Sequence, residues 1–170
     1  MLVRRLNNED ELLLIRRRNI ISDYQEKGIC FSCQNFISGD IFPDDGLIIY
    51  EDDLVRCQFE KYPRATGQTI IVSKHHYEDI SEMPIDLGTH ILKLSHAIIK
   101  LHKEILAAEK VYMCTICDGK RNHLHFQLLP RLKGETIGYQ NFVREEGVLI
   151  DYHETANRYR EALAKITFHN

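Results

Sequence analysis

A long run of regularly spaced apolar residues constrains this chain more than any other part of its sequence. Pro84 is followed by apolar side chains at alternating intervals of four and three residues, namely Leu87, Ile91, Leu94, Ile98, Leu101 and Ile105. This spacing places them on one face of an α-helix, and proline is favoured at the start of a helix. We therefore expect one long amphipathic helix from residue 84, with its apolar face packed on the rest of the chain.

Short segments rich in strand-forming residues lie on both sides of this helix, separated by turn-forming residues. The expected strands are 47–50, 54–59, 69–73, 111–117 and 124–129. Their clustering as hairpins favours antiparallel pairing, and Pro130 is expected to end the last strand. The fold class predicted from this order is α+β, with a five-stranded antiparallel sheet, the long central helix and a helix near each terminus.

The two terminal helices are predicted from capping pairs and apolar spacing. They are expected at about 8–26 and about 152–166. Asn8 with Glu11 and Asp151 with Glu154 have the three-residue spacing of a capping box.

Composition and charge limit the classes of function. The 170 residues are 44% hydrophobic and 28% charged with a net charge of −3, so we expect one folded domain over 1–170. The absence of a basic excess argues against binding of duplex nucleic acid. No apolar stretch approaches the roughly 20 residues that span a bilayer, so we expect no membrane association.

Four of the five cysteines form two C-x-x-C pairs, Cys30/Cys33 and Cys114/Cys117, and Cys57 stands alone. Without a signal peptide, such pairs suggest metal ligation or redox chemistry in a reducing cytoplasm. The second pair has odd spacing for one strand face, which favours two small buried residues. A site shared by all four paired cysteines is the alternative.

The segment Asn122–Arg131 carries the most informative polar residues. In a strand, alternate side chains point to the same face. The side expected to face the core holds Leu124, Phe126 and Leu128, and the other side holds His123, His125 and Gln127. A neutral imidazole is a good nucleophile near pH 7, but histidines at this spacing also occur as metal ligands or surface residues.

The stretch H-L-H-F-Q-L-L-P-R resembles the active-site strand of the histidine triad (HIT) superfamily, whose motif is His-φ-His-φ-His-φ-φ with φ apolar. The segment from Phe59 to His76 is similar to the family's strand-loop-strand, which ends in Lys-x-His. With the helix between them, the resemblance covers roughly 30–131 and implies a HIT-like fold.

The resemblance also implies a chemistry. His125 would attack the phosphorus next to the nucleoside and form a covalent nucleotidyl-histidine, which water or another acceptor resolves. Gln127 departs from the family's third histidine, as in galactose-1-phosphate uridylyltransferases and diadenosine tetraphosphate phosphorylases. Because an amide does not titrate, Gln127 would steady the intermediate without relaying a proton.

Substrate and partners follow from the same resemblance. The substrate would be a diadenosine polyphosphate, a nucleotide phosphoramidate or a similar compound, with Glu60 on the ribose and Phe59 near the base. Asn122 is a further substrate-binding candidate. Family members commonly pair, so the resemblance implies a homodimer. The alternatives are a catalytically weak nucleotide sensor and a zinc-stabilised interaction module.

The resemblance implies a structural zinc ion, held by Cys30, Cys33, His76 and His123. His75 is the alternative ligand to its neighbour His76. Such a site would tie the N-terminal turn to the catalytic strand.

The other polar residues of the helices are expected to be solvated or to cap helix ends. The histidines in this group are His90, His96, His102, His153 and His169. Arg16, Arg17 and Arg18 could steer a polyanionic substrate, but a solvated helix face is the favoured interpretation.

Overall fold

The structure is a computed structural model that describes residues 1–39, 41–42, 46–166 and 168, so that His169 lies outside the described part. The strands are β1 (Leu2–Arg5), β2 (Ile48–Glu51), β3 (Val55–Phe59), β4 (Thr69–Ser73), β5 (Lys110–Cys114), β6 (His125–Arg131) and β7 (Gly147–Ile150). The helices are α1 (Asn8–Glu26), α2 (Phe31–Ser38), α3 (Ile85–Leu106) and α4 (His153–Leu163), with short 3₁₀ turns at Ile80–Glu82 and Tyr139–Asn141.

Five strands form one antiparallel sheet in the order β2-β3-β4-β6-β5. This confirms the predicted fold class and the meander of β2, β3 and β4. The strand that carries His125 and Gln127 lies between β4 and β5. Gln127 lies between Ile70 of β4 and Cys114 of β5, whereas His125 lies opposite Val72 of β4 and beyond the end of β5.

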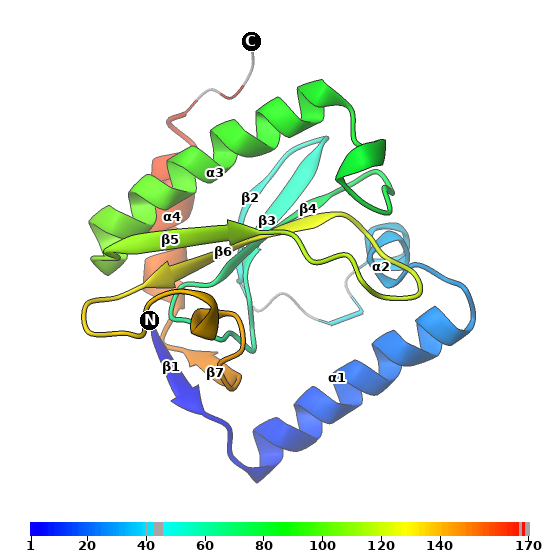
Figure 1. Cartoon of the computed structure of the whole chain (residues 1–170), viewed down its shortest axis with the longest axis horizontal. Coiled ribbons are helices and arrows are strands. Elements are labelled where there is room, and N and C mark those ends of the chain that lie inside the picture. Colours follow the sequence, from blue (N-terminus) through cyan, green and yellow to red (C-terminus); the bar gives the residue numbers. More distant parts are fainter. Residues whose placement is uncertain (40, 43–45, 167, 169–170) are drawn as a thin grey trace.

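One face of the sheet packs against α3 and α4 and forms the hydrophobic core. The long helix is confirmed, and its predicted apolar face contributes Leu87, Ile91, Leu94, Ile98 and Leu101 to that core. Figure 1 shows α3 above the sheet and α1 below it. Among the described residues, no helix is both long enough and apolar enough to cross a membrane.

The terminal helices have the expected positions, but the predicted capping pairs are wrong. In α1 the N-cap is Asn7, whose side chain accepts from the Asp10 nitrogen while the Asp10 carboxylate accepts from the Asn7 nitrogen. The box is shifted one residue from Asn8 and Glu11. In α4 the N-cap is Tyr152, which makes no side-chain capping bond.

The strand β6 also extends further along the chain than predicted. β6 runs through Pro130 to Arg131. Since β4 pairs with β6 only as far as Leu128, Pro130 has a strand neighbour on the β5 side alone, where it lies opposite Val111. A proline without an N–H is tolerated at such a position.

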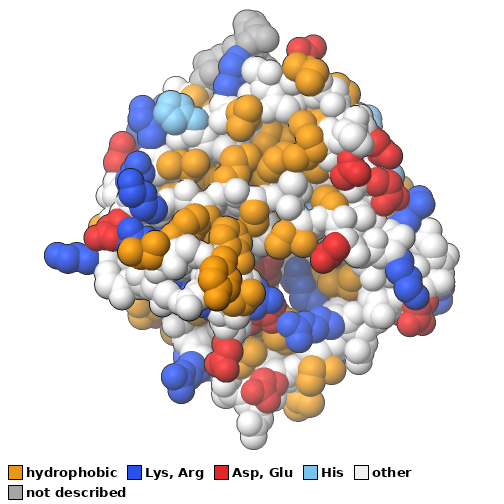
Figure 2. Space-filling model, viewed as in Figure 1, with side chains coloured by type: hydrophobic (Ala, Val, Ile, Leu, Met, Phe, Trp, Pro, Cys, Tyr) orange, Lys and Arg blue, Asp and Glu red, His pale blue; other side chains and the backbone are white. Residues whose placement is uncertain are grey.

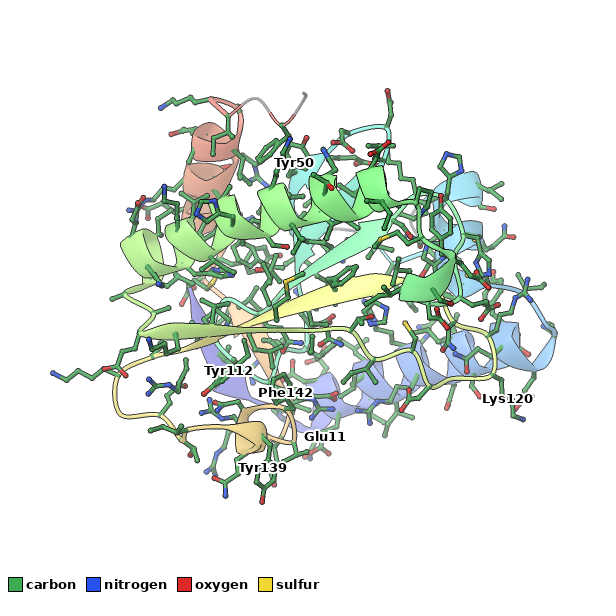
Figure 3. The ribbon with its side chains drawn as sticks, turned by 45° about the horizontal axis from the view of Figure 1, so that its top comes forward. Glu11, Tyr50, Tyr112, Lys120, Tyr139 and Phe142 are labelled. Atoms are coloured by element: carbon green, nitrogen blue, oxygen red, sulfur yellow. The ribbon has the colours of Figure 1, made fainter. Side chains whose placement is uncertain are left out.

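Three elements were not predicted. The helix α2 occupies the segment expected to be a turn around the first C-x-x-C pair. The strands β1 and β7 pair antiparallel, with Leu2 opposite Ile150 and Arg5 opposite Gly147, in a separate two-stranded sheet. The connection before β7 folds back on β5, where Phe142 contacts Tyr112 with 5.6 Å between ring centres (Figure 3).

Two of the helical histidines are buried, which corrects the expectation of solvated roles. His102 is fully buried between sheet and helix, where its Nδ1 lies 2.7 Å from the Tyr159 hydroxyl. His90 is 7% exposed, and its Nε2 lies 2.7 Å from a carboxylate oxygen of Asp52.

Candidate active site and metal centre

The predicted alternation along β6 is confirmed. Leu124, Phe126 and Leu128 belong to the hydrophobic core. His125 and Gln127 are partly exposed on the opposite face, the one that α1 and α2 cover. The side chains expected to take part in the reaction therefore line cavities between the sheet and these helices.

A backbone carbonyl fixes the orientation of the His125 ring. Its Nδ1 lies 2.9 Å from the carbonyl oxygen of His123, and a carbonyl can only accept. Nδ1 must therefore carry the proton, which leaves the lone pair on Nε2. The side-chain nitrogen of Gln127 lies 3.5 Å from that Nε2.

Two cavities meet at His125. The first has a volume of about 410 Å³ and lies toward α2 and the cysteine pair. The second has a volume of about 320 Å³ and lies toward Gln127 and the loop between β3 and β4. Figure 2 shows a hollow in the surface with Lys or Arg side chains inside it.

The expected substrate residues have different positions. Glu60 lines both cavities, and Asn122 lines the first, where its Oδ1 accepts the Gly119 N–H at 2.8 Å. The expectation for Phe59 is wrong: it is fully buried and packs edge-on against Tyr159 in the core. Because side chains alternate along β3, Gln58 lines the first cavity in its place.

Three aromatic side chains that line the first cavity were not predicted from the sequence as site residues. They are Phe31, Phe36 and Phe42. The first two belong to α2, so their position depends on a helix that was not predicted. The available signal was an aromatic residue inside the C-x-x-C pair, Phe31, and another three residues after it, Phe36.

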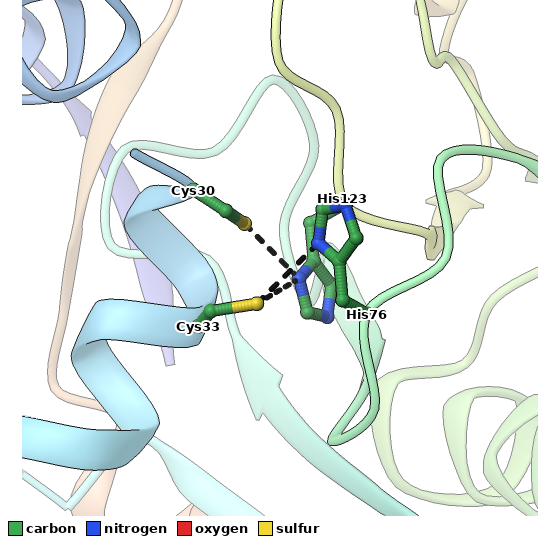
Figure 4. Close-up of side chains that lie close together, drawn as sticks. All are labelled: Cys30, Cys33, His76 and His123. Atoms are coloured by element: carbon green, nitrogen blue, oxygen red, sulfur yellow. Dashed lines mark hydrogen bonds between the residues drawn. The ribbon is translucent and has the colours of Figure 1, made fainter. Parts of the chain in front are cut away.

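The four residues named as metal ligands come together. Their ligand atoms all lie within 4.8 Å of one another (Figure 4). His123 Nδ1 is 3.3 Å from the Cys30 sulfur and 3.4 Å from the Cys33 sulfur, and His76 Nδ1 is 3.4 Å from the Cys33 sulfur. Cys30 is the N-cap of α2 and Cys33 lies in its first turn, which brings both thiols to one side.

Both histidines have a hydrogen-bond acceptor at their other nitrogen. His123 Nε2 donates to the Ser73 carbonyl oxygen at 2.6 Å, and His76 Nε2 donates to a Glu78 carboxylate oxygen at 3.2 Å. These bonds direct the unprotonated Nδ1 atoms at the thiols. Such outer partners are typical of metal-bound histidines.

The donor set fits zinc. Tetrahedral bonds of about 2.3 Å to sulfur and about 2.05 Å to nitrogen place these atoms about 3.5 Å apart, close to the spacings found here. Burial and a hydrogen bond with Cys30 raise the pKa of Cys33 to about 11, so metal binding would displace a thiol proton. Burial lowers the pKa of His123, which favours its neutral, ligating form.

The alternative ligands do not join this cluster. His75 is exposed, while its neighbour His76 belongs to the cluster. Cys114 and Cys117 are partly exposed rather than buried. Within the described ranges, the only group of three or more close metal-binding side chains is the one above, so the four-cysteine site is not formed.

Comparison with known proteins identifies the family, although no family model matches the chain. An uncharacterized HIT-like protein of Methanocaldococcus jannaschii is 30% identical over 112 residues, which cover 63% of this chain and 82% of that protein. The chain therefore belongs to the histidine triad (HIT) superfamily.

Solved structures agree with this assignment. A zinc-bound histidine triad family protein from Mycobacterium smegmatis is 25% identical, with a TM-score of 0.61 over 80% of this chain and 94% of that one. A Plasmodium falciparum diadenosine triphosphate hydrolase shares the fold at 11% identity, with a TM-score of 0.55 over 74% of this chain and 82% of that one. A nucleotide hydrolase thus has the same fold, and this chain has a cluster of side chains able to bind a metal.

Proposed function

We propose that the protein is a nucleotide hydrolase or nucleotidyltransferase that acts at the nucleoside-linked phosphate through a covalent nucleotidyl-histidine on His125. The observation that carries the proposal is the hydrogen bond from Nδ1 of His125 to the His123 carbonyl. It leaves Nε2 with a lone pair at the junction of the two cavities. An oriented neutral imidazole is a competent nucleophile toward phosphorus at pH 7.

The nucleoside would occupy the first cavity. Phe31, Phe36 and Phe42 offer aromatic faces and edges for a base. Glu60 and Gln58 line the same cavity and offer acceptors for ribose hydroxyls. The two cavities also argue against an interaction module without a pocket.

Gln127 would stabilise the reacting phosphate. Its side-chain nitrogen lies beside the Nε2 of His125, so it can donate to a phosphoryl oxygen as negative charge builds there. Since an amide cannot release a proton, Gln127 would orient and stabilise rather than act as an acid.

Zinc would have a structural role in this proposal. Cys30, Cys33, His76 and His123 would hold it, and it would supply bonds that tie α2 to the start of β6. The aromatic side of the first cavity and the carbonyl that orients His125 would both be fixed by this connection. A reducing cytoplasm and a homodimer remain predictions from the cysteines and the resemblance.

Trapping the intermediate tests the proposal. The protein would be mixed with diadenosine tetraphosphate, UDP-glucose or adenosine 5′-phosphoramidate, quenched within seconds and examined by intact mass spectrometry. The expected result is a nucleotidyl adduct in the wild type that is absent in His125→Ala.

His75→Ala is the matched control, because His75 is exposed and outside the site. It should form the adduct like the wild type. An adduct that persists in His125→Ala would contradict the proposal. Tight nucleotide binding with neither adduct nor turnover would instead favour the nucleotide sensor.

A further inference from the structure

Arg17 of α1 lies over the catalytic face of the sheet. Its side chain lines both cavities, together with His125 and Glu60. It is partly buried, and its guanidinium carbon is 4.6 Å from the centre of the Phe42 ring. This corrects the expectation of a solvated arginine face, which holds for the exposed neighbour Arg16.

Among the described residues, no carboxylate matches the charge of Arg17, unlike the charges of the other arginines that line the second cavity. Arg18 and Arg64 both pair with Glu146, at 2.5 and 2.9 Å. Within the described part of the chain, no carboxylate makes an ion pair with Arg17. A partly desolvated guanidinium without a counter-ion favours an anionic ligand, and its planar donors match a phosphate.

We propose that the second cavity receives the leaving group and that Arg17 binds it as a phosphate anion. The substrate is then a nucleoside phosphoanhydride, such as a dinucleoside polyphosphate, rather than a phosphoramidate. This inference rests on the function proposed for His125. It assigns the first cavity to the nucleoside and the second to the rest of the phosphate chain.

The chemical step is balanced with these groups alone. Nε2 of His125 forms a bond to the nucleoside-linked phosphorus while the P–O bond to the next phosphate breaks. The leaving oxygen keeps the bonding electrons, and Arg17 neutralises the added charge. Water then forms a new P–O bond as the P–N bond breaks, which returns the lone pair to Nε2 and releases one proton to solvent.

The amide at Gln127 supports the same class of leaving group. It stands next to Nε2 and has no titratable proton to give. A phosphate with a second pKa of about 6 departs as a stable anion at pH 7. An amine must take up a proton as its bond to phosphorus breaks, and Gln127 does not supply one.

The first test is calorimetric titration of the full protein with inorganic tripolyphosphate, which does not depend on turnover. Arg17→Met keeps the length of the side chain and removes its charge. It should weaken tripolyphosphate binding about 10- to 100-fold, the range expected for loss of a charge-assisted hydrogen bond. Arg16→Met, on the same helix but exposed, should bind within about two-fold of the wild type.

The second test compares leaving groups on one nucleoside. Arg17→Met should lower kcat/KM for diadenosine tetraphosphate by the same factor, whereas adenosine 5′-phosphoramidate turnover should be low in the wild type and unchanged in the variant. Equal losses for both substrates, or tripolyphosphate binding unaffected by Arg17→Met, would overturn the inference.

The two proposals fail in distinguishable ways. Tripolyphosphate binding that depends on Arg17, without any adduct on His125, would reject the chemistry and keep the anion site. An adduct that forms on His125 while Arg17→Met binds tripolyphosphate and turns over diadenosine tetraphosphate like the wild type would reject the anion site and keep the chemistry.

Discussion

The side-chain nitrogen of Gln68 donates a hydrogen bond to the Oε1 of Gln127 across 2.9 Å. Gln68 is fixed in this orientation because its own Oε1 accepts the backbone N–H of Arg64 at 2.7 Å, and a backbone nitrogen can only donate. Gln127 must therefore turn its NH₂ toward His125. Donors thus face the site where a phosphoryl group would react, and the carbonyl faces away.

Changing Gln68 to Glu should reverse the Gln127 amide. A carboxylate at this position still accepts from Arg64 but can no longer donate, so Gln127 would turn its NH₂ toward it and its carbonyl toward the phosphoryl oxygens. We expect kcat to fall about 100-fold, as on loss of an oxyanion donor, with KM within about three-fold. Both kcat and KM would be measured by steady-state kinetics with the substrate that the wild type turns over fastest.

Two variants control for nonspecific effects. Gln68→Leu removes the fixing bond without imposing the reverse orientation, so its loss of kcat should be smaller, at about 10-fold. Gln140→Glu adds the same charge on the surface and should leave kcat unchanged. If Gln68→Glu retained wild-type kcat, the hydrogen bond between Gln68 and Gln127 would have no role in the reaction.

Zinc retention should depend on the complete Cys/His cluster. Cys30→Ser replaces a thiolate by a hydroxyl that ligates zinc poorly, so elemental analysis should find less than about a tenth of the wild-type zinc. The melting temperature should fall to that of the chelator-treated wild type. Cys117→Ser, with a partly exposed thiol outside the cluster, should retain both the zinc and the melting temperature. Wild-type zinc content in Cys30→Ser would exclude this thiol as a ligand.

Sequence periodicity was sufficient to predict an element where the apolar repeat is long or where core and site residues alternate strictly. The 22 residues of α3 repeat an apolar face over several turns, and β6 alternates core and site residues. The metal cluster could be predicted because the resemblance indicated which histidines and cysteines, far apart in the sequence, come together. The family's strand-loop-strand did not fix which side chains of β3 face the site: Phe59 was expected near the base, and the structure has its neighbour Gln58 there.

Short and nonlocal elements could not be predicted in this way. α2 has only eight residues, and its N-cap Cys30 makes no side-chain capping bond that a sequence pattern would reveal. β1 and β7 have four residues each and pair across almost the whole chain. Gln68 bonds to Gln127, and Arg17 lies over Phe42; these contacts join segments that are distant in the sequence or in different elements, and no local pattern indicates them.

The close pairing of β1 with β7 predicts that Gly147 cannot carry a side chain. A Cβ there would lie 2.4 Å from a methyl carbon of Val3 and 2.6 Å from the carbonyl oxygen of Arg4, and the backbone atom cannot move aside easily. Gly147→Ala should lower the free energy of unfolding by about 1–3 kcal/mol, measured by urea denaturation.

Gly88 provides a control with the opposite expected sign. It lies inside α3, where a Cβ would meet only the flexible end of Met83. Gly88→Ala should therefore raise the free energy of unfolding by about 0.5–1 kcal/mol. Equal stability of Gly147→Ala and wild type would mean that β1 does not pair closely with β7 in solution.

Burial of His102 predicts a pH-dependent component of stability. The Thr69 hydroxyl donates to the Gly67 carbonyl, so it accepts from Nε2 of His102, 3.2 Å away, and Tyr159 must donate to Nδ1 at 2.7 Å. The ring is held neutral, and burial lowers its pKa from 6.5 to about 3. Between these two pH values the unfolded chain binds the extra proton, so acidification favours unfolding.

The wild type should therefore lose about 1.4 kcal/mol of folding free energy per pH unit through His102 as the pH falls below about 6. His102→Gln cannot take up this proton. When urea denaturation is followed from pH 6 to pH 4.5, the free energy of unfolding of this variant should fall by about 1.4 kcal/mol less per pH unit than that of the wild type. His96→Gln, on the exposed side of the same helix, should keep the wild-type slope. Identical slopes in His102→Gln and the wild type would show that His102 takes up its proton as readily in the folded protein as in the unfolded chain.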